Sequence, residues 1–241
     1  MTSSVDNRLP RYLRLRDDIA ARIARREWRP GEPIPSEMEL AKEHGIAVGT
    51  VRKAVDQLVA EGVLDRQQGR GTFVRRLRFN SLFRFFRFQS ESGERRIPES
   101  RILQRTVAAA PAPVAAALHV RPGDDVIRLS RLRLIDDIPL LAEEIWLPRA
   151  RFEPLLKIET SGFGDLLYPL YEECCDEIVA SVEETITVEF ADAMQARLLH
   201  REVGAPLIVI ERTAFDFDRH PIEWRHSRGP ADRFRYHVEI R

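Results

Sequence analysis

The chain begins with a segment in which apolar side chains recur at helical spacing. Between Arg11 and Glu27 the apolar positions lie three or four residues apart: Tyr12, Leu15, Ile19 and Ile23. This spacing places them on one side of an α-helix, so the pattern predicts an amphipathic helix. The segment ends at Trp28-Arg29-Pro30-Gly31, because proline is not accepted in a helix interior and glycine favours a turn.

Two shorter helices are predicted next. Ser36 and Glu39 have the spacing of a capping box, in which each side chain bonds the other residue's backbone N–H at a helix start. Gly45 is suited to end that helix. From about Gly49 to Glu61 a second one-sided apolar stripe follows: Val51, Ala54, Val55, Leu58 and Val59. Two short helices joined by a tight turn at a glycine are typical of a helix-turn-helix.

A β-hairpin with a basic, glycine-rich tip is predicted after the third helix. The chain there runs Val63-Leu64, then Arg66-Gln67-Gln68-Gly69-Arg70-Gly71, then Thr72-Phe73-Val74. Two short apolar segments around glycines favour paired strands. Beside the third helix, such a hairpin is the wing of a winged helix.

The rest of the chain alternates between predicted strands and short helices. Strands are predicted over 102–107, 126–135, 140–147, 206–217, 221–228 and 234–240, and helices over 112–118, 164–173 and 191–201. Short turns such as Asp136-Asp137 join consecutive strands, which favours hairpins. We therefore predict an α+β fold: a winged helix-turn-helix, then a mainly antiparallel sheet with helices packed on it.

Several ionisable residues lie inside the predicted strands. Arg131 and Arg133 are two apart and so share a face; Glu143 is in the partner strand, and Glu223 and Arg225 are again two apart. They could form surface cross-strand salt bridges, each contributing about 0–1 kcal/mol. Alternatively they could converge on a polar cavity that holds an anion on arginines and hydroxyls on carboxylates. Taken alone, the pattern favours the surface pairs.

Composition narrows the class of protein. Of 241 residues, 44% are hydrophobic and 32% charged, which is ordinary for a globular chain. No apolar run approaches the roughly 18–20 residues of a membrane span, and no signal peptide is visible. Cys174 and Cys175 are adjacent, which disfavours a disulfide framework or a zinc site. No cationic residue adjoins them in the sequence, which favours inert thiols over a redox sensor. No catalytic motif, metal or cofactor is predicted, and a reducing cytoplasm is expected.

The net charge of zero hides an asymmetry. Residues 1–78 carry 16 Lys/Arg and 11 Asp/Glu, whereas residues 79–241 carry 22 and 27. A basic first part suits DNA phosphates, and Arg52 and Lys53 could also donate to guanine in the major groove. Gly69 and Gly71 would let the hairpin approach DNA, with Arg70 in a groove. Any one of these residues could instead belong to a solvated face or an ordinary turn, but the set in this order favours DNA binding.

The same segments resemble the winged-helix domain of GntR-type transcriptional regulators over about residues 10–75. The motifs are Ile34-Pro-Ser-Glu-Met-Glu-Leu-Ala, Gly49-Thr-Val-Arg-Lys-Ala, Glu61-Gly-Val-Leu and Gln68-Gly-Arg-Gly-Thr-Phe-Val. The resemblance implies sequence-specific DNA binding as a homodimer, with these residues at the DNA: Ser36, Thr50, Arg52, Lys53, Arg70, Gly71 and Thr72. Met38 and Val48 stand where many members have arginine, which shifts base recognition to Arg52, Lys53 and Arg70.

A second resemblance covers about residues 80–241. Its motifs are Arg131-Leu-Arg133, Ile138-Pro139, Glu143, Leu147-Pro148, Pro221-Ile-Glu223, Ser227 and Asp232-Arg-Phe-Arg-Tyr. These motifs resemble the UTRA effector domain of the HutC branch of GntR regulators. This implies a six-stranded antiparallel sheet, shared with chorismate lyase. The implied effector contacts are Ser90, Ser92, Arg131, Arg133, Glu143, Glu223, Arg225 and Ser227. With Arg225 and Arg228 at positions that are usually small or aromatic, four arginines would surround an anionic small molecule.

Together these features predict a cytoplasmic transcription factor with three parts. Residues 1–76 are expected to bind DNA, 77–89 to link, and 90–241 to bind effector and dimerise. We expect a repressor that binds an inverted-repeat operator in double-stranded DNA as a homodimer. Two rivals are a lyase-like enzyme, suggested only by the shared fold, and a non-specific architectural DNA binder, which leaves the acidic second part unexplained.

Overall fold

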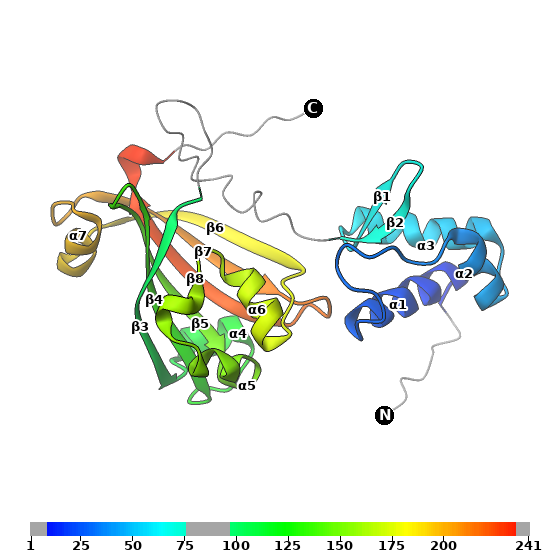
Figure 1. The fold of residues 1–241 in the computed structure, drawn as a ribbon, viewed down its shortest axis with the longest axis horizontal. Helices are drawn as coiled ribbons and strands as arrows, with labels where there is room; N and C mark the ends of the chain where they lie inside the picture. The colour runs from blue at the N-terminus through cyan, green and yellow to red at the C-terminus, as the bar shows by residue number, and fades with distance from the viewer. Residues whose placement is uncertain (1–8, 76–96, 235–241) are drawn as a thin grey trace. The chain divides into compact units, whose positions relative to one another are not determined.

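The computed structural model describes residues 9–75 and 97–234. The chain divides into two compact units, Met1–Leu77 and Arg78–Arg241 (Figure 1). The predicted linker over 77–89, Ser90 and Ser92 lie outside the described residues, as does the strand predicted over 234–240 except for its first residue.

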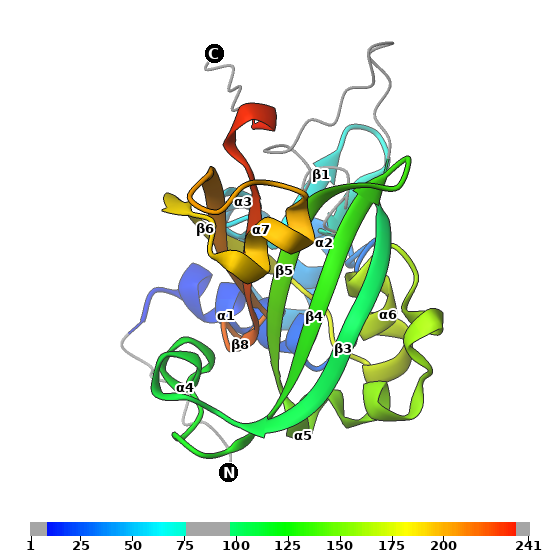
Figure 2. The same ribbon diagram turned by 90° about the vertical axis from the view of Figure 1, so that its left-hand side faces the viewer.

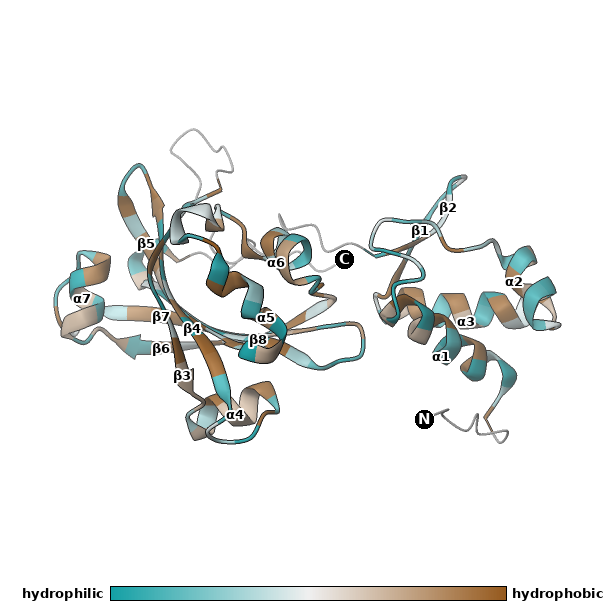
Figure 3. Cartoon of the chain, turned by 60° about the horizontal axis from the view of Figure 1, so that its bottom comes forward, coloured by the Kyte–Doolittle hydropathy of each residue, from teal (hydrophilic) through white to brown (hydrophobic). Residues whose placement is uncertain are grey.

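The first unit contains three helices and a hairpin. They are α1 (Arg11–Ala24), α2 (Glu37–His44), α3 (Val48–Ala60), β1 (Leu64–Gln67) and β2 (Gly71–Val74). Apolar and polar residues alternate along α1 and α3 (Figure 3), and Ile19 of α1 and Leu58 of α3 are completely buried. Helix α1 ends earlier than predicted, because Arg26 adopts a left-handed φ of 63°. The predicted helix-turn-helix and wing are otherwise confirmed.

The second unit is built on a six-stranded sheet. Its strands are β3 (Glu99–Ala109), β4 (Asp125–Ile135), β5 (Ile138–Pro148), β6 (Ser181–Phe190), β7 (Pro206–Phe215) and β8 (Pro221–Pro230). They are ordered β3-β4-β5-β8-β7-β6, and all neighbours are antiparallel. Figure 2 shows β3, β4 and β5 side by side. Asp136 and Asp137 both have positive φ, as a type I′ turn requires between hairpin strands.

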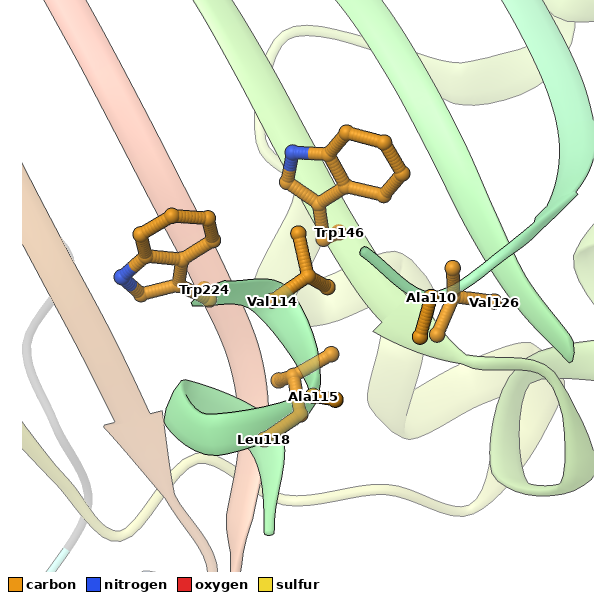
Figure 4. Packing of buried hydrophobic residues seen from close by; sticks show 7 residues of the cluster. All are labelled: Ala110, Val114, Ala115, Leu118, Val126, Trp146 and Trp224. Carbon is orange, nitrogen blue, oxygen red and sulfur yellow. The ribbon is translucent and has the colours of Figure 1, made fainter. Parts of the chain in front are cut away.

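Helices cover both faces of this sheet. Helix α4 (Ala112–Leu118) packs on Trp146 and Trp224 (Figure 4), and α7 (Ala193–Leu199) packs on the same face beside Ala142. The other face carries α5 (Arg149–Phe152), two 3-10 turns (Glu153–Lys157 and Thr160–Phe163) and α6 (Leu167–Cys175). Within the described ranges, no helix is long and apolar enough to cross a membrane.

One strand of the sheet was not predicted. Among the strands that the structure describes, β6 lies at the sheet edge and pairs with β7 alone. Its sequence does carry the signal, because Val182, Ile186, Val188 and Phe190 occupy alternate positions. Glu184 interrupts this alternate series, and Glu183 and Glu189 also lie in the strand, so the apolar pattern is weak.

Candidate functional site

Ser36 has a structural role at the start of α2. Its hydroxyl donates to Glu39 Oε2 at 2.7 Å and accepts from the Glu39 backbone N–H at 3.3 Å, while its own N–H donates to Glu39 Oε2 at 2.8 Å. These hydrogen bonds lower the pKa of Glu39. The predicted capping box is therefore confirmed. It orients the first turn of α2, which holds Glu37 and Met38.

Ser36→Ala is expected to destabilise the first unit by about 1 kcal/mol, because an N-cap side chain is lost. Chemical denaturation of the full chain, followed by a probe in α1–α3, measures this change. Ser36→Asp is the matched control, since aspartate also caps helices and should restore most of the stability. Equal stability of wild type and Ser36→Ala would contradict the capping role.

Two arginines, one on α3 and one on β1, share a carboxylate of α2. Glu37 accepts from Arg52 Nε at 2.9 Å and from Arg66 Nη2 at 3.1 Å, and Arg66 also pairs with Asp56 at 2.8 Å. The Arg52 side chain is 62% exposed. An exposed ion pair contributes only about 0–1 kcal/mol, so Arg52 can exchange Glu37 for an external acceptor at little cost.

The other predicted DNA contacts lie on α3 and the hairpin. Lys53 Nζ lies 4.0 Å from the centre of the Tyr12 ring, which directs this ammonium toward α1. Arg70 and Gly71 are exposed at the hairpin tip. Thr50 and Thr72 are half-buried, and the Thr72 carbonyl accepts from the Ile34 N–H at 2.9 Å. The first unit therefore presents the guanidinium groups of α3 and the hairpin to solvent.

The second unit contains a buried ionic cluster, which we define as Arg131, Arg133, Glu143, Arg212, Glu223 and Arg225. Sheet register brings these residues to one face, because Arg131 pairs with Glu143, Glu143 with Ser227, and Arg212 with Arg225. Each member is less than a tenth exposed. Surface cross-strand salt bridges are therefore the wrong interpretation for this cluster.

Glu143 lies at the centre of three donors. It accepts from Arg131 Nε at 2.5 Å and Ser227 Oγ at 2.9 Å, and Arg225 Nη1 lies 3.6 Å away. Burial alone would raise the pKa of Glu143, but the charges of Arg131, Arg225 and Arg133 outweigh burial and hold that pKa well below its usual range. Glu143 is therefore ionised inside the protein.

Glu223 is held by α6 as well as by its own strand. It accepts from Tyr171 Oη at 2.7 Å, Tyr168 Oη at 3.2 Å and Arg225 Nη2 at 2.7 Å. Burial and the Glu223 charge raise the pKa of both tyrosines. Burial would lower the pKa of Arg225, but Glu223 and Glu143 raise it well above its usual value. Arg225 therefore connects the two carboxylates.

Arg133 is the guanidinium whose charge the fold favours least. It donates to the Asp165 backbone carbonyl, and burial together with the charge of Arg131 lowers its pKa to about 10. The cluster holds four arginines but only two glutamates. Half-buried Glu184 adds a third carboxylate, which accepts from Arg212 Nε at 2.6 Å. Among the buried and half-buried residues that the structure describes, four guanidinium groups therefore face three carboxylates.

One expectation about this cluster needs correction. Arg228 was expected to be the fourth arginine, but it pairs with Ala142 across β5–β8, on the opposite face, and donates to Glu189 at 2.9 Å. Arg212, which sequence reasoning missed, takes that place. The available signal was its polar position within the apolar strand β7. His226 also lies on the opposite face, against Trp224.

The cysteines carry no reactive signature. Cys174 and Cys175 are free and half-buried. Burial raises the pKa of Cys175 to about 11, which disfavours the nucleophilic thiolate. Within residues 9–75 and 97–234, no group of three or more His, Cys, Asp or Glu side chains could hold a metal ion.

Comparison with known families agrees with the two-unit architecture. Residues 11–74 match the bacterial regulatory proteins of the gntR family, and residues 93–235 match the UTRA domain. The chain belongs to the GntR family of transcriptional regulators. Its UTRA domain places the regulator in the HutC branch, so both family resemblances are confirmed.

The matches to similar proteins extend over most of this chain and most of each matched chain. The "Probable fructoselysine utilization operon transcriptional repressor" of Escherichia coli (strain K12) is 34% identical over 212 residues, covering 87% of this regulator and 84% of that protein. The repressor NagR of Bacillus subtilis (strain 168) is 28% identical, with coverages of 95% and 93%. The crystal structure of PhnF from Mycobacterium smegmatis shares the fold at 24% identity, with a TM-score of 0.56 and coverages of 94% and 99%.

These relatives exclude one of the rival functions. Both are named transcriptional repressors, and the matches extend over the part that corresponds to the sheet. The lyase-like activity was suggested only by a fold shared with an enzyme, and a fold does not carry a function. The present chain is a DNA-binding regulator with an effector domain, and it is not an enzyme.

Proposed function

We propose that this regulator is a cytoplasmic repressor whose operator affinity is controlled by a small anion bound at the buried ionic cluster. It binds an inverted repeat as a homodimer, one winged helix on each half-site. Residues 1–76 bind DNA, 77–89 link, and 90–241 bind effector and dimerise. Two relatives are named repressors, and the matched ranges 11–74 and 93–235 support this division.

The excess of buried positive charge is the observation that carries the proposal. Isolated charges are expensive to bury, and a buried ionic group is weak support for stability. Four buried guanidinium groups facing two buried carboxylates and half-buried Glu184 leave one positive charge in excess, which favours a binding function. Arg131 Nη1 is a buried donor that has no hydrogen-bond partner among the described residues. An anionic ligand would supply the missing negative charge and acceptor.

The contacts of the carboxylates narrow the chemistry of the effector. Glu143 already accepts from two protein donors and has Arg225 as an ion-pair neighbour, and Glu223 accepts from three donors. This leaves them less capacity for effector hydroxyls than the sequence indicated. The arginines are thus the principal recognition groups, and arginine pairs best with planar or tetrahedral anions such as carboxylate and phosphate. Ser90 and Ser92 stay candidate hydroxyl donors.

Control of DNA binding follows from differential affinity. If the effector binds a DNA-incompetent arrangement of the dimer more tightly, it shifts the population toward that arrangement. A tenfold preference corresponds to about 1.4 kcal/mol. An effector that bound both arrangements equally would not release the operator.

A paired thermal-shift screen tests the effector class. The full chain is heated with phosphate, sugar phosphates and dicarboxylates, each beside a neutral analogue of similar size. A true effector at 100 times its Kd should stabilise by about 2.7 kcal/mol, and its neutral analogue should not. Stabilisation by neutral sugars alone would contradict the anionic assignment.

Sedimentation of the same full chain tests the homodimer, since a monomer at operator-binding concentrations would contradict it.

Arg52→Ala tests sequence-specific DNA binding. If Arg52 contacts a base, specific binding should weaken by roughly 1–3 kcal/mol, with a smaller loss on random DNA. Competition between operator and random duplexes, measured at fixed salt concentration, distinguishes a loss of specific binding from a loss of general DNA binding. Arg25→Ala is a matched control, because Arg25 is exposed and lies beyond the last turn of α1. Equal losses on both duplexes would make Arg52 a phosphate contact, as an architectural binder requires.

A further inference from the structure

Two exposed apolar side chains stand at the starts of α2 and α3. Met38 is 74% exposed and Val48 is 37% exposed. Among the described residues of the first unit, the only other exposed large apolar side chain is Leu9, which precedes α1. The unit's core explains neither Met38 nor Val48, so a partner is the better explanation for their position.

Arg52 connects the first turn of α2, which holds Met38, with the first turns of α3, which hold Val48. Val48 is the first residue of α3, and Arg52 follows four positions later, on the same side of the helix. Arg52 donates to Glu37, the residue next to Met38. Val48 therefore lies on the side of α3 that carries Arg52, and Met38 lies in the same first turn of α2 as the carboxylate that Arg52 contacts. In helix-turn-helix proteins, the start of the second helix contacts base edges.

Gly49 gives an independent indication of a close partner. It is exposed in the first turn of α3, its φ is not positive, and a Cβ placed there would meet nothing within 4 Å. The fold thus has no need of glycine here, although glycine inside a helix costs about 0.5–1 kcal/mol relative to alanine. The missing side chain leaves room for a surface that approaches α3 closely.

The chemistry of the major groove indicates which DNA group Met38 and Val48 can contact. Each base pair there offers hydrogen-bond donors and acceptors, and the apolar group is the C5-methyl of thymine. Methionine and valine cannot hydrogen-bond to a base edge with their side chains, but they can bury a methyl group. We propose that Met38 and Val48 contact thymine methyl groups beside the base contacted by Arg52, and that Gly49 permits this approach. This inference rests on the proposed sequence-specific DNA binding.

Removal of single methyl groups from DNA tests the proposal. Duplexes are first selected from a random pool with the full chain, and each thymine of the selected site is then replaced singly by deoxyuridine, which lacks only the methyl. At one or two positions per half-site, binding should weaken about three- to tenfold, as expected for a lost apolar contact. With Met38→Ala or Val48→Ala, the matching deoxyuridine should have no further effect.

Matched control variants distinguish the loss of a DNA contact from a general effect of removing exposed apolar surface. Met194→Ala and Val203→Ala remove side chains that are 63% and 69% exposed in the second unit, and they should keep the full deoxyuridine effect. Gly49→Ala should weaken operator binding while thermal stability is unchanged or higher. A selected site whose deoxyuridine forms all bind normally would overturn the methyl contact but leave the proposed function intact. Failure to select any sequence would overturn the proposed function itself.

Discussion

Arg225→Met is expected to destabilise the second unit by about 3–5 kcal/mol, because removing one partner of a buried ion pair leaves charge uncompensated. Arg225 connects Glu143 and Glu223, so its loss affects both carboxylates. For a unit of this size, the expected fall in Tm is roughly 6–20 °C. Differential scanning calorimetry of the full chain measures it.

The pH dependence of folding stability provides a second test of the Arg225→Met variant. The pKa of Glu143 is held below its usual value in the folded state, so its charge contributes stability at neutral pH. That contribution is lost as pH falls below the ordinary glutamate pKa of about 4.3 toward the lowered value. The stability gap between wild type and Arg225→Met should therefore narrow below about pH 4.3. A gap that is independent of pH would show that Arg225 acts through packing.

Arg133→Met is expected to weaken the effector response roughly ten- to a hundredfold, because a charge-assisted hydrogen bond contributes about 1.5–3 kcal/mol. Operator affinity without effector should stay unchanged. Burial and Arg131 already disfavour the Arg133 charge, so its removal should destabilise the second unit less than Arg225→Met does, by about 1–3 kcal/mol for the Asp165 carbonyl left without this donor. Operator release is titrated with the anion that gives the largest thermal shift.

Arg128→Met is the matched control for both substitutions. Arg128 lies on β4 with Arg131 and Arg133, but it faces the other side of the sheet and pairs with Glu144 at 2.5 Å while half exposed. Its loss should change neither the effector response nor stability appreciably, since exposed pairs contribute about 0–1 kcal/mol. An unaltered effector response in a folded Arg133→Met variant would place the effector elsewhere.

The sequence by itself determined the first unit almost completely. Helical spacing in α1 and α3, the capping box at Ser36 and the glycines around Arg70 are local signals, and each lies within a few residues of the element it specifies. The structure added the pairing of Arg52 with Glu37, which connects residues of two helices. It also showed that Ser36 is held by Glu39, as a cap requires.

In the second unit, local patterns predicted most strands. They did not predict whether the side chains on each face of a strand are buried or exposed to solvent. Period-two spacing placed Arg131 and Arg133 on one face, and the family resemblance associated them with Glu143 and Glu223. Whether that face is solvated or buried depends on which strands become neighbours and on the helix that covers them.

The decisive contacts lie far apart in the chain. Tyr171 meets Glu223 across 52 residues, and Ser227 meets Glu143 across 84. Only the strand order β4-β5-β8-β7 puts Arg212 into the cluster and Arg228 on the opposite face. One residue of register reverses the face of every side chain in a strand, and no local pattern sets the register between β5 and β8. The charge excess at this site is therefore a property of the assembled sheet.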